Sequence, residues 1–319
     1  MHPPPKRRAK KLTRSFLSVG DVNKQEFEAI LERAKDLKAQ IRDQRLEIDT
    51  LNQKIVGLLF EKPSTRTRTS FEVAVLRLGG EAVYLPSNEL QLSRGEPIKD
   101  TARILGGYLD CLVARVYAHD TVVHLAQYSG LPVINALSDL EHPTQIVCDL
   151  LTVMEAKGKL EGLKLAFIGD GNNVCNSLLL GCATVGMDMS VACPKGYEPD
   201  KGILQKATEI GRTSGVNLSV IREPTEAVKD ADVLYTDVWV SMGEEKERQK
   251  RLRTFRGYQI NSKLLSSAGG GAIVMHCLPA HRGLEITDDV IESRRSIVWQ
   301  QGENKLYGAA AILDFLLKR

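Results

Sequence analysis

The sequence lacks a long apolar run, since no window approaches the ~18 consecutive apolar residues that a membrane-spanning helix needs. Its basic start is not followed by the apolar segment of a secretory signal. The six cysteines form no CxxC pair, and they stand at positions 111, 148, 175, 182, 193 and 277, several of them inside apolar runs. We therefore expect a cytoplasmic protein with reduced thiols and no membrane contact.

Acidic residues are absent from the first 20 positions, which hold six of the 43 basic residues. The rest of the chain has 37 basic and 40 acidic residues, so it lacks the basic surface of a nucleic-acid-binding protein. The start has the acid-free character of an organellar transit peptide, but it contains few serines and begins with a proline run. We interpret it as a short solvated tail. A tether for RNA or an anionic surface, through residues 6–14, is the alternative that a salt-dependent binding assay would test.

An anion-binding motif is predicted at residues 61–72, which read EKPSTRTRTSFE. The preceding apolar run 55–60 is expected to be a buried strand, and Ser64 or Thr65 is expected to cap the helix that follows. A helix N-terminus has unpaired N–H groups and a partial positive charge, which stabilise a bound phosphate. Arg66 adds a planar donor fork that matches phosphate oxygens. Basic residues in a first turn oppose the helix dipole, so a solvated capped helix explains the motif poorly.

Short apolar strands alternate with amphipathic helices along the chain, which is typical of parallel βα units. The expected strands are residues 55–60, 82–85, 111–114, 133–136, 164–168, 189–192, 217–221, 233–236 and 272–275. Helices are expected at 21–41, after Ser64, at 98–109, from Thr121, at 144–157 and from Asn176. The length of 319 residues suits two domains. We predict an α/β fold with two doubly wound parallel-sheet domains, joined by interdomain helices that include 144–157.

Polar residues follow the predicted strands at their carboxyl ends, where doubly wound sheets bind ligands. They are Arg115; Ser138, Asp139, His142 and Gln145; Asp170, Asn172 and Asn173; Asp237, Ser241 and Met242; and His276, Cys277 and Leu278. Each one has an ordinary structural explanation, since Asp139 is suited to start a helix and Cys277 to serve as a small buried hydrophobe. Their convergence at one edge favours a shared binding site.

A nicotinamide-cofactor site is the main rival, because residues 169–174 read GDGNNV after a predicted strand. Val174 stands at the third glycine position of that fingerprint. The next strand ends in Cys193-Pro194 instead of the acidic residue that binds a ribose hydroxyl. We therefore interpret Asn173 as a hydrogen-bonding group for a polar small molecule, and we expect no nicotinamide cofactor.

A metal site is also disfavoured, because His276 and Cys277 are adjacent and no second ligand pair lies at metal spacing. The charged run 244–253 is expected to be a solvated loop or helix.

The chain resembles the aspartate and ornithine carbamoyltransferase superfamily from about residue 12 to its C-terminus. The segments that carry the resemblance are STRTRTSFE at 64–72, EHPTQ at 141–145, DVWVSMG at 237–243 and HCLP at 276–279. Aspartate-specific members have a proline-leucine pair where this chain has Cys277-Leu278, and they lack the SMG sequence, so the resemblance is to the ornithine-specific members. It implies transfer of a carbamoyl group from carbamoyl phosphate to the side-chain amine of ornithine, giving citrulline and phosphate without a metal or organic cofactor.

The resemblance also implies roles for individual residues. Carbamoyl phosphate would be bound by Ser64, Thr65, Arg66, Thr67, Gln91, Arg115, His142, Gln145 (on the carbamoyl amide), Cys277, Leu278 and Lys305, and ornithine by Asn173, Asp237, Ser241 and Met242. Arg115 and His142 would polarise the carbamoyl oxygen. Asp237 would pair with the α-ammonium group of ornithine. Cys277, the third catalytic residue, would orient the attacking amine with the backbone of Leu278 and favour its neutral form.

Two positions, Lys305 and Gln91, need a comparison with the family pattern. The family usually has arginine after the Glu-Asn pair near the C-terminus, whereas this chain has Lys305, which keeps the charge but loses the donor fork. Gln91 is placed where relatives reach into the phosphate site of a neighbouring subunit. The resemblance therefore implies an active site between subunits and a homo-oligomer, either a trimer or a multiple of trimers.

The expected division is a carbamoyl-phosphate-binding domain at 1–145, with a C-terminal helix at 304–319 packing back on it, and an ornithine-binding domain at 146–303. Carbamoyltransferases that act on putrescine, lysine or acetylornithine are the alternatives. Use of Asp237 and Ser241 to hold an α-amino acid group would separate them from an ornithine enzyme. Arginine biosynthesis is the expected pathway, and the degradative direction uses the same site chemistry.

Overall fold

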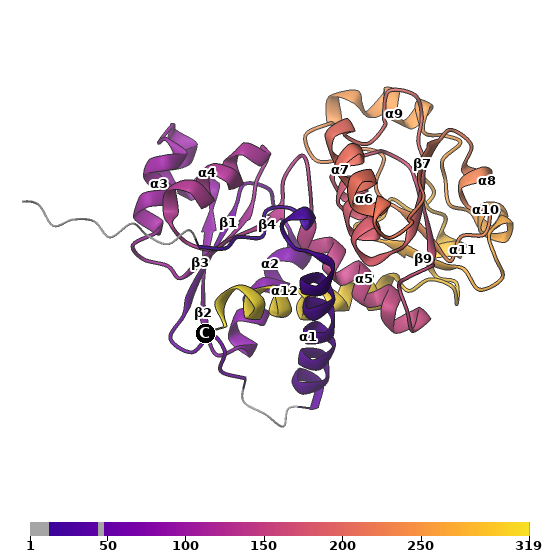
Figure 1. Cartoon of the computed structure of the whole chain (residues 1–319). Coiled ribbons are helices and arrows are strands. Elements are labelled where there is room, and N and C mark those ends of the chain that lie inside the picture. The colour runs from indigo at the N-terminus through magenta and orange to yellow at the C-terminus, as the bar shows by residue number, and fades with distance from the viewer. Residues whose placement is uncertain (1–12, 44–47, 319) are drawn as a thin grey trace, which may run out of the picture.

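The structure, a computed structural model, describes residues 13–43 and 48–318. Two parallel sheets, each covered by helices, lie side by side (Figure 1). The α/β fold with two doubly wound sheets that the sequence predicts is therefore confirmed. In the described residues no helix is both long enough and apolar enough to cross a membrane. Most of the basic tail lies outside the described residues.

The order of the strands places a switch point in each sheet. The first sheet runs β2 (Glu81–Pro86), β1 (Ile55–Phe60), β3 (Cys111–Arg115) and β4 (Val133–Leu137); the second runs β7 (Leu218–Ile221), β6 (Asp188–Ala192), β5 (Lys164–Ile168), β8 (Val233–Thr236) and β9 (Ile273–His276). The order reverses between β1 and β3 in the first sheet and between β5 and β8 in the second. Loops at such points are where doubly wound sheets bind ligands. Each expected strand is present, with its ends within one residue of expectation.

The helices follow the expected alternation. They are α1 (Lys24–Asp43), α2 (Thr65–Arg77), α3 (Ile98–Leu105), α4 (His119–Ser129), α5 (Pro143–Lys157), α6 (Asn173–Val185), α7 (Lys201–Arg212), α8 (Pro224–Ala227), α9 (Arg248–Thr254), α10 (Ser262–Ser267), α11 (Asp288–Ile291) and α12 (Val298–Leu317), with 3-10 turns η1 (Val19–Asp21), η2 (Ser87–Glu89), η3 (Gln91–Arg94) and η4 (Glu245–Glu247). The helix in the structure is shorter than the helix 98–109 that the sequence predicts. It ends at Leu105 because Gly106 and Gly107 follow, and a Cβ at Gly106 would lie 2.1 Å from the carbonyl oxygen of Ser129.

One hydrophobic core joins the two sheets. Leu58 and Val113 of the first sheet belong to the same cluster of buried side chains as Phe167 and Tyr235 of the second, together with residues of α1, α2, α5, α6 and α12. The opposite faces of the sheets have clusters of their own, with α3 and α4 on the first and α8, α10 and α11 on the second. Because each large apolar side chain contributes about 1.5–3 kcal/mol when buried, the shared cluster fixes the relative placement of the sheets.

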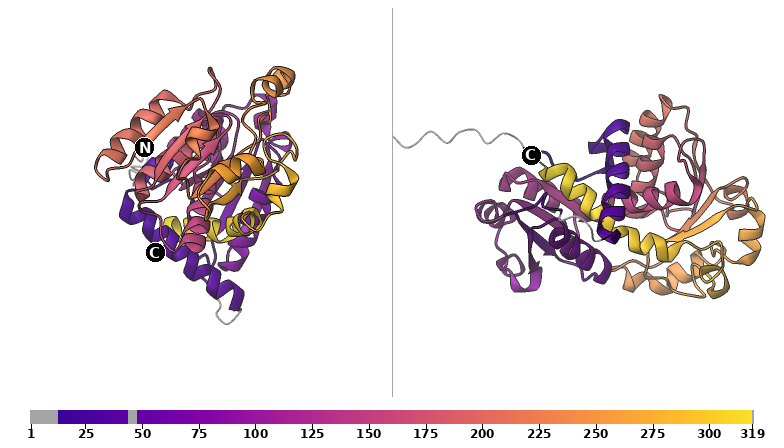
Figure 2. Two further views of the ribbon diagram at one scale, coloured as in Figure 1. Left: turned by 90° about the vertical axis from the view of Figure 1, so that its right-hand side faces the viewer. Right: turned by 90° about the horizontal axis from the view of Figure 1, so that it is seen from below.

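The last helix, α12, crosses from the second sheet to the first, as Figure 1 and the view from below in Figure 2 show. It packs on α5, α2 and α1. Gly308 allows a close approach to α5, since a Cβ at this position would lie 2.9 Å from the sulfur of Cys148. The helix begins at Val298, six residues before the expected start at 304. The proposed boundary between domains at residues 145 and 146 stays a prediction.

The glycines of the GDGNNV turn have a structural explanation. Gly169, directly after β5, has a φ of +142°, and a Cβ at Gly171 would lie 2.2 Å from the backbone nitrogen of Pro199. The N–H of Gly171 donates to the carbonyl oxygen of Tyr197 at 2.9 Å. Close packing of two turns therefore accounts for the pattern that otherwise suggested a nicotinamide cofactor.

Replacing Gly171 with alanine is expected to lower the free energy of unfolding by about 1–3 kcal/mol, because the methyl group would overlap backbone atoms. Urea unfolding followed by circular dichroism measures the change. Gly257→Ala is the matched control, since a Cβ there meets no atom within 4 Å. Unfolding of Gly171→Ala at the same urea concentration as the parent protein would contradict the steric explanation.

Candidate active site

The carboxyl ends of both sheets open onto one cavity of about 610 Å³. The first sheet contributes the residues after β1, β3 and β4, and the second contributes those after β5, β8 and β9. The predicted residues that line the cavity are Ser64, Thr65, Arg66, Thr67, Arg115, His142, Gln145, Asn173, Asp237, Ser241, Met242, Cys277, Leu278 and Lys305. The two switch points therefore form a single site between the sheets.

Other residues selected from the strand ends do not line the cavity but organise the turns around it. Asp139 accepts a hydrogen bond from the backbone N–H of His119 at 2.8 Å, and Ser138 bonds to the ring of the same histidine at 2.9 Å. Asn172 caps α6 by accepting from Val174 and Cys175. Strand-end position alone does not separate such residues from those that face the cavity.

Gln91 also lies away from the cavity, exposed in η3. A contact from Gln91 to the phosphate site of a neighbouring subunit stays a prediction.

The start of α2 has the geometry of an anion site. Ser64 is the N-cap, and its hydroxyl accepts from the backbone N–H of Thr67 at 3.3 Å. The first turn carries no acidic residue, and Arg66 is half-buried with its side chain lining the cavity. Burial lowers the pKa of Arg66 from its ordinary value, because the charged guanidinium is partly removed from water. A bound anion would relieve this cost.

The cavity holds positive charge that the protein does not neutralise. In the part of the chain that the structure describes, no carboxylate lies within 4.0 Å of the guanidinium of Arg66 or Arg115. Arg115 is only 7% exposed, and its buried Nε has no hydrogen-bond partner. Burial, together with the nearby Arg66, lowers the pKa of Arg115 to about 10. Two neighbouring unpaired cations indicate a site for a dianion such as a phosphate.

Two lysines add to this charge. Lys305, on α12, donates from Nζ to Oε1 of Gln145 on α5, and burial lowers its pKa. Lys62 also lines the cavity, with Nζ 4.5 Å from the ring centre of Tyr117, and burial followed by repulsion from Arg115 lowers its pKa. Lys62 was given no role from the sequence. Its place in the 61–72 segment, two residues before Ser64, was the available signal.

His142 is a neutral imidazole at the base of the cavity. Burial is the main reason that its pKa lies well below the ordinary value, and the charges of Lys305 and Arg115 add to the effect. Its Nδ1 lies 3.3 Å from the hydroxyl of Thr144. When Nδ1 accepts that hydroxyl proton, Nε2 carries the ring hydrogen and can donate to an oxygen in the cavity.

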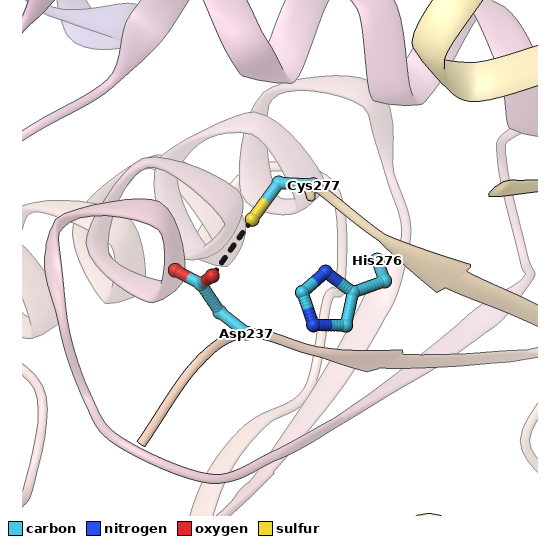
Figure 3. Close-up of side chains that lie close together, drawn as sticks. All are labelled: Asp237, His276 and Cys277. Atoms are coloured by element: carbon cyan, nitrogen blue, oxygen red, sulfur yellow. Dashed lines mark hydrogen bonds between the residues drawn. The ribbon is translucent and has the colours of Figure 1, made fainter. Parts of the chain in front are cut away.

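Cys277 is a protonated thiol that is hydrogen-bonded to a carboxylate (Figure 3). Its Sγ donates to Oδ1 of Asp237 at 2.9 Å, and Oδ2 of Asp237 accepts from Nδ2 of Asn172 at 2.8 Å. Burial raises the pKa of Cys277 well above its ordinary value, and the negative charge of Asp237 raises it further. A thiol in this state is a hydrogen-bond donor and a poor nucleophile.

Asp237, His276 and Cys277 bring three atoms of metal-ligand type within 4.8 Å of one another, a grouping that sequence spacing did not predict. Both ring nitrogens of His276 are already used. Nδ1 accepts from the backbone N–H of Leu278 at 2.8 Å, so Nε2 carries the hydrogen and donates to Glu285 at 3.1 Å. These bonds fix the turn after β9, and the donor set does not fit a metal ion.

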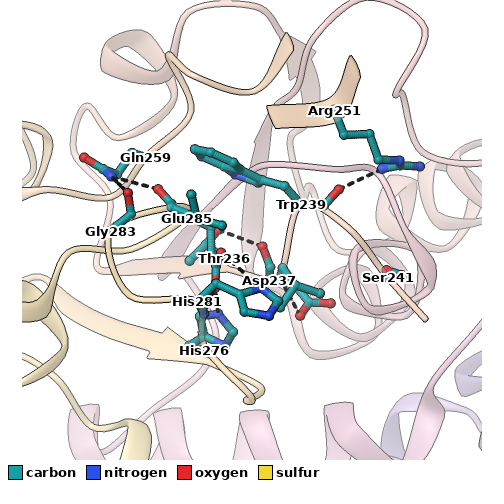
Figure 4. Close-up of polar contacts among 12 residues, drawn as sticks. Thr236, Asp237, Trp239, Ser241, Arg251, Gln259, His276, His281, Gly283 and Glu285 are labelled. Atoms are coloured by element: carbon teal, nitrogen blue, oxygen red, sulfur yellow. Dashed lines mark hydrogen bonds and ion pairs between the residues drawn. The ribbon is translucent and has the colours of Figure 1, made fainter. Parts of the chain in front are cut away.

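Arg251 holds the turn of residues 237–243 in place by hydrogen bonds (Figure 4). Arg251 is 7% exposed and donates to Asp170 at 2.7 Å, to the carbonyl oxygen of Trp239 at 3.0 Å and to Glu244. Glu244 in turn accepts from the backbone N–H of Ser241 at 2.8 Å. The expectation that run 244–253 is solvated was therefore wrong at Arg251, because this residue pairs with a buried carboxylate.

The turn 237–243 and α6 supply the remaining polar groups of the cavity. Asn173 donates from Nδ2 to the carbonyl oxygen of Ser138 at 2.6 Å, which leaves its Oδ1 as an acceptor. Met242 is 44% exposed and also lines the cavity. This side of the cavity, with Asp237 at its base, is suited to an ammonium group, whereas the opposite side is suited to an anion.

Comparison with known proteins agrees with this geometry. Residues 14–155 match the family described as aspartate/ornithine carbamoyltransferase, carbamoyl-P binding domain, and residues 161–316 match its Asp/Orn binding domain. The chain belongs to the aspartate/ornithine carbamoyltransferase family. The resemblance stated from the sequence is thereby confirmed.

Members of this family match almost the whole chain. The ornithine carbamoyltransferase of Methanosarcina acetivorans is 52% identical over 96% of this chain and 100% of its own length. A protein of Thermoplasma acidophilum named as a catabolic ornithine carbamoyltransferase is 49% identical over 95% of this chain and 98% of its own. The solved structure of the ornithine carbamoyltransferase from Pyrococcus furiosus has a TM-score of 0.92 at 47% identity and covers 95% of this chain and 97% of that one.

Arg66→Ala is expected to weaken the binding of inorganic phosphate and carbamoyl phosphate by about tenfold or more, because a charge-assisted hydrogen bond contributes about 1.5–3 kcal/mol. Titration calorimetry measures both affinities. Arg68→Ala is the matched control, since Arg68 pairs with Glu72 at 3.0 Å and stacks on Tyr84 away from the cavity. Arg66→Lys should recover only part of the affinity. Equal losses in the Arg66 and Arg68 variants would overturn the assignment of the anion site.

Proposed function

We propose that the protein is an ornithine carbamoyltransferase. It transfers the carbamoyl group of carbamoyl phosphate to the side-chain amine of L-ornithine and releases L-citrulline and phosphate. The observation that carries this proposal is the single cavity between the two sheets, with unpaired Arg66 and Arg115 on one side and Asp237 with the 237–243 turn on the other. Such a cavity accommodates an anionic donor and a cationic acceptor side by side.

The phosphate group is bound at the start of α2. Backbone N–H groups of the first turn and the hydroxyls of Ser64, Thr65 and Thr67 donate to its oxygens, and Arg66 supplies a two-pronged contact. Lys62 adds positive charge from the same loop. The charges also stabilise the phosphate as it leaves, because negative charge on its oxygens increases when the bond to the carbamoyl carbon breaks.

Arg115 and His142 act on the carbamoyl group. Both donate to the carbonyl oxygen, which gains negative charge during attack at the carbon. The unpartnered Nε of Arg115 and the neutral His142 support this role. Gln145 accepts from the carbamoyl NH₂. Lys305 holds Gln145 and contributes a single charged donor where the family usually has the arginine fork.

Ornithine is held by its amino-acid end. Asp237 pairs with the α-ammonium group, and Asn173, Ser241 and Met242 form the rest of this subsite. The side-chain amine then lies beside Cys277 and the carbonyl oxygen of Leu278, whose own N–H is already bonded to His276. The amine must lose its proton before it attacks, since an ammonium group has no lone pair.

The chemical step is direct transfer. The neutral amine donates its lone pair to the carbamoyl carbon, a new C–N bond forms, and the bond between that carbon and the phosphate oxygen breaks. The amine proton is released, and phosphate leaves with the bonding electrons. Proximity of two substrates bound in one cavity supplies much of the acceleration, and no covalent intermediate with the protein is required.

Another amine acceptor is the alternative. Putrescine has no α-amino acid group for Asp237 and Ser241 to bind, and acetylornithine has no free α-ammonium group. Parallel assays with carbamoyl phosphate and ornithine, putrescine, lysine, acetylornithine or aspartate test the choice. Turnover of putrescine or acetylornithine above that of ornithine would refute the proposed acceptor.

We also propose the biological setting. The enzyme acts in the cytoplasm in arginine biosynthesis, with residues 1–145 binding carbamoyl phosphate and residues 146–303 binding ornithine. It assembles as a homotrimer or a multiple of trimers, in which Gln91 reaches the phosphate site of the next subunit. The exposure of Gln91 supports this assembly. Sedimentation analysis tests it, and a monomer or dimer with full activity would rule it out.

Asp237→Asn is expected to raise the Michaelis constant for ornithine at least tenfold, because the α-ammonium group loses its charged partner, whose hydrogen bond contributes about 1.5–3 kcal/mol. Calorimetric binding of carbamoyl phosphate alone should change little. Asp139→Asn is the control, since Asp139 also follows a strand but bonds to His119 outside the cavity. Equal loss of both substrates in the Asp237 variant would make Asp237 a structural residue instead.

Activity of the parent enzyme is expected to rise with pH between about 7 and 9, because the ornithine amine, like that of lysine, has a pKa near 10. The neutral fraction grows about tenfold per pH unit in this range. Cys277 stays protonated, since burial raises its pKa. Cys277→Ser should therefore be impaired mainly in ornithine binding, remain active and keep the same slope of kcat/KM against pH.

Initial rates across this pH range provide the measurement, with Cys111→Ser as the control because Cys111 lies at the opposite end of β3 from the cavity. Rapid quenching after mixing with carbamoyl phosphate alone detects any carbamoylated protein. A stoichiometric burst of phosphate with a carbamoyl group on Cys277 would replace direct transfer by a covalent mechanism.

A further inference from the structure

The side-chain amide of Gln145 is held from both ends. Its Nε2 donates to Oδ1 of Asp149 at 2.7 Å, one turn further along α5, and its Oε1 accepts from Nζ of Lys305. Gln145 and Asp149 are each 1% exposed, and Lys305 is 7% exposed. A reversed amide would place its oxygen against a carboxylate and its NH₂ against an ammonium group. The two partners therefore permit one orientation.

Asp149 has enough donors around it to remain a fixed acceptor. Besides Gln145, it accepts from Nε2 of Gln301 at 2.7 Å and from the hydroxyl of Tyr235 at 2.8 Å. An ionised carboxylate accepts hydrogen bonds and donates none, so the NH₂ groups of both glutamines must face it. Gln301 also accepts from the backbone N–H of His276 at 2.9 Å, which joins this cluster to the turn that carries Cys277.

We propose that Asp149 is a positioning residue that makes Gln145 present its carbonyl oxygen to the cavity, and thereby selects a donor substrate with an amide NH₂. Gln145 and Lys305 line the cavity and Asp149 does not, so the oxygen is the Gln145 atom on the cavity side. A carbamoyl NH₂ donates to that oxygen, whereas the methyl group of an acetyl phosphate cannot. The inference rests on the proposed function, in which Gln145 binds the carbamoyl amide.

Two stable analogues of the same shape test the selection without turnover. Phosphonoacetamide ends in an amide NH₂, and 2-oxopropylphosphonate has a methyl group in its place. Titration calorimetry on the full-length protein should show that the amide analogue binds about tenfold more tightly, because its NH₂ donates to the second lone pair of the Gln145 oxygen and the methyl group of the other analogue cannot. Inorganic phosphate is the third probe, and it reports on the anion site alone.

Asp149→Asn should shift the affinity ratio of the two analogues toward one, because asparagine can donate as well as accept, and only Lys305 then opposes rotation of the Gln145 amide. Its affinity for inorganic phosphate should stay within about twofold of the parent value. The variant is expected to fold, since burial already raises the pKa of Asp149 to about 6 and a neutral side chain is therefore tolerated. Asp149→Ala is measured in parallel and has the same expected ratio.

Asp314→Asn is the matched control for stability. Asp314 is also a buried carboxylate, 3% exposed, and it accepts from Arg33 at 2.9 Å and from Thr50 at 2.9 Å, far along α12 from the cavity. This variant should lose thermal stability and keep the affinity ratio of the parent. A loss of the ratio here would show that the ratio responds to destabilisation and would overturn the positioning role.

The positioning role is also overturned if either folded Asp149 variant keeps the parent ratio, or if the parent protein binds the two analogues equally. Failure of the proposed function is seen separately. A parent protein that prefers the amide analogue but does not carbamoylate ornithine would contradict the acceptor assignment and support the role of Asp149. Restoration of the ratio in Asp149→Glu, which is again only an acceptor, would support that role further.

Discussion

The contact between α5 and α12 is the constraint on which the site depends. Gly308 lets the two helices approach closely, and a row of buried polar pairs then sets how one lies along the other. The pairs are Lys305 with Gln145, Gln301 with Asp149, and Asn304 with Thr152 and Glu155. A shift of one helix by a single turn would break these hydrogen bonds, and each buried group that found no new partner would cost about 1–3 kcal/mol. Because α5 and α12 also belong to the core shared by both sheets, this register determines how the two strand edges face each other.

The cavity that results is divided by charge. Burial lowers the pKa of Arg66, Arg115, Lys62 and Lys305, which means that these cations stay charged at some energetic cost. A dianion bound among them would remove that cost and strengthen each contact in a site with little water. On the other side, Asp237 is already committed to Cys277 and Asn172, so its orientation is set before an acceptor arrives. Both halves are thus arranged in advance for charges of opposite sign.

Much of this arrangement could be predicted from local sequence. The strands were predictable because parallel strands buried on both faces appear as short apolar runs, and the anion site because capping residues and arginines occur together in the 61–72 segment. Position after a strand identified cavity residues such as Arg115 and Asn173. The same criterion selected Asp139, which does not line the cavity, because the direction of a side chain depends on the turn that carries it.

Other features depend on contacts between distant segments. Nothing near Asp149 or Gln301 in sequence marks them, because each is a polar residue within a helix whose partners lie on other elements. Arg251 appeared to belong to a solvated run, and only the fold brings Asp170 to it. The role of Lys62 was missed because nothing in the 61–72 segment distinguishes this lysine from a solvated one. The domain boundary and the position of Gln91 in an assembly remain predictions.

The burial of all six cysteines has a consequence for chemical probing of the folded chain. Burial raises the pKa of every one of these thiols, so only a small fraction of each cysteine is present as the reactive thiolate at neutral pH. Cys277 is the cysteine that lines the cavity, whereas the other five are reached only when packed segments separate. The rate of alkylation at each cysteine therefore measures how often the structure around it opens. Cys277 reports on the site, and the other five cysteines report on the cores of both sheets.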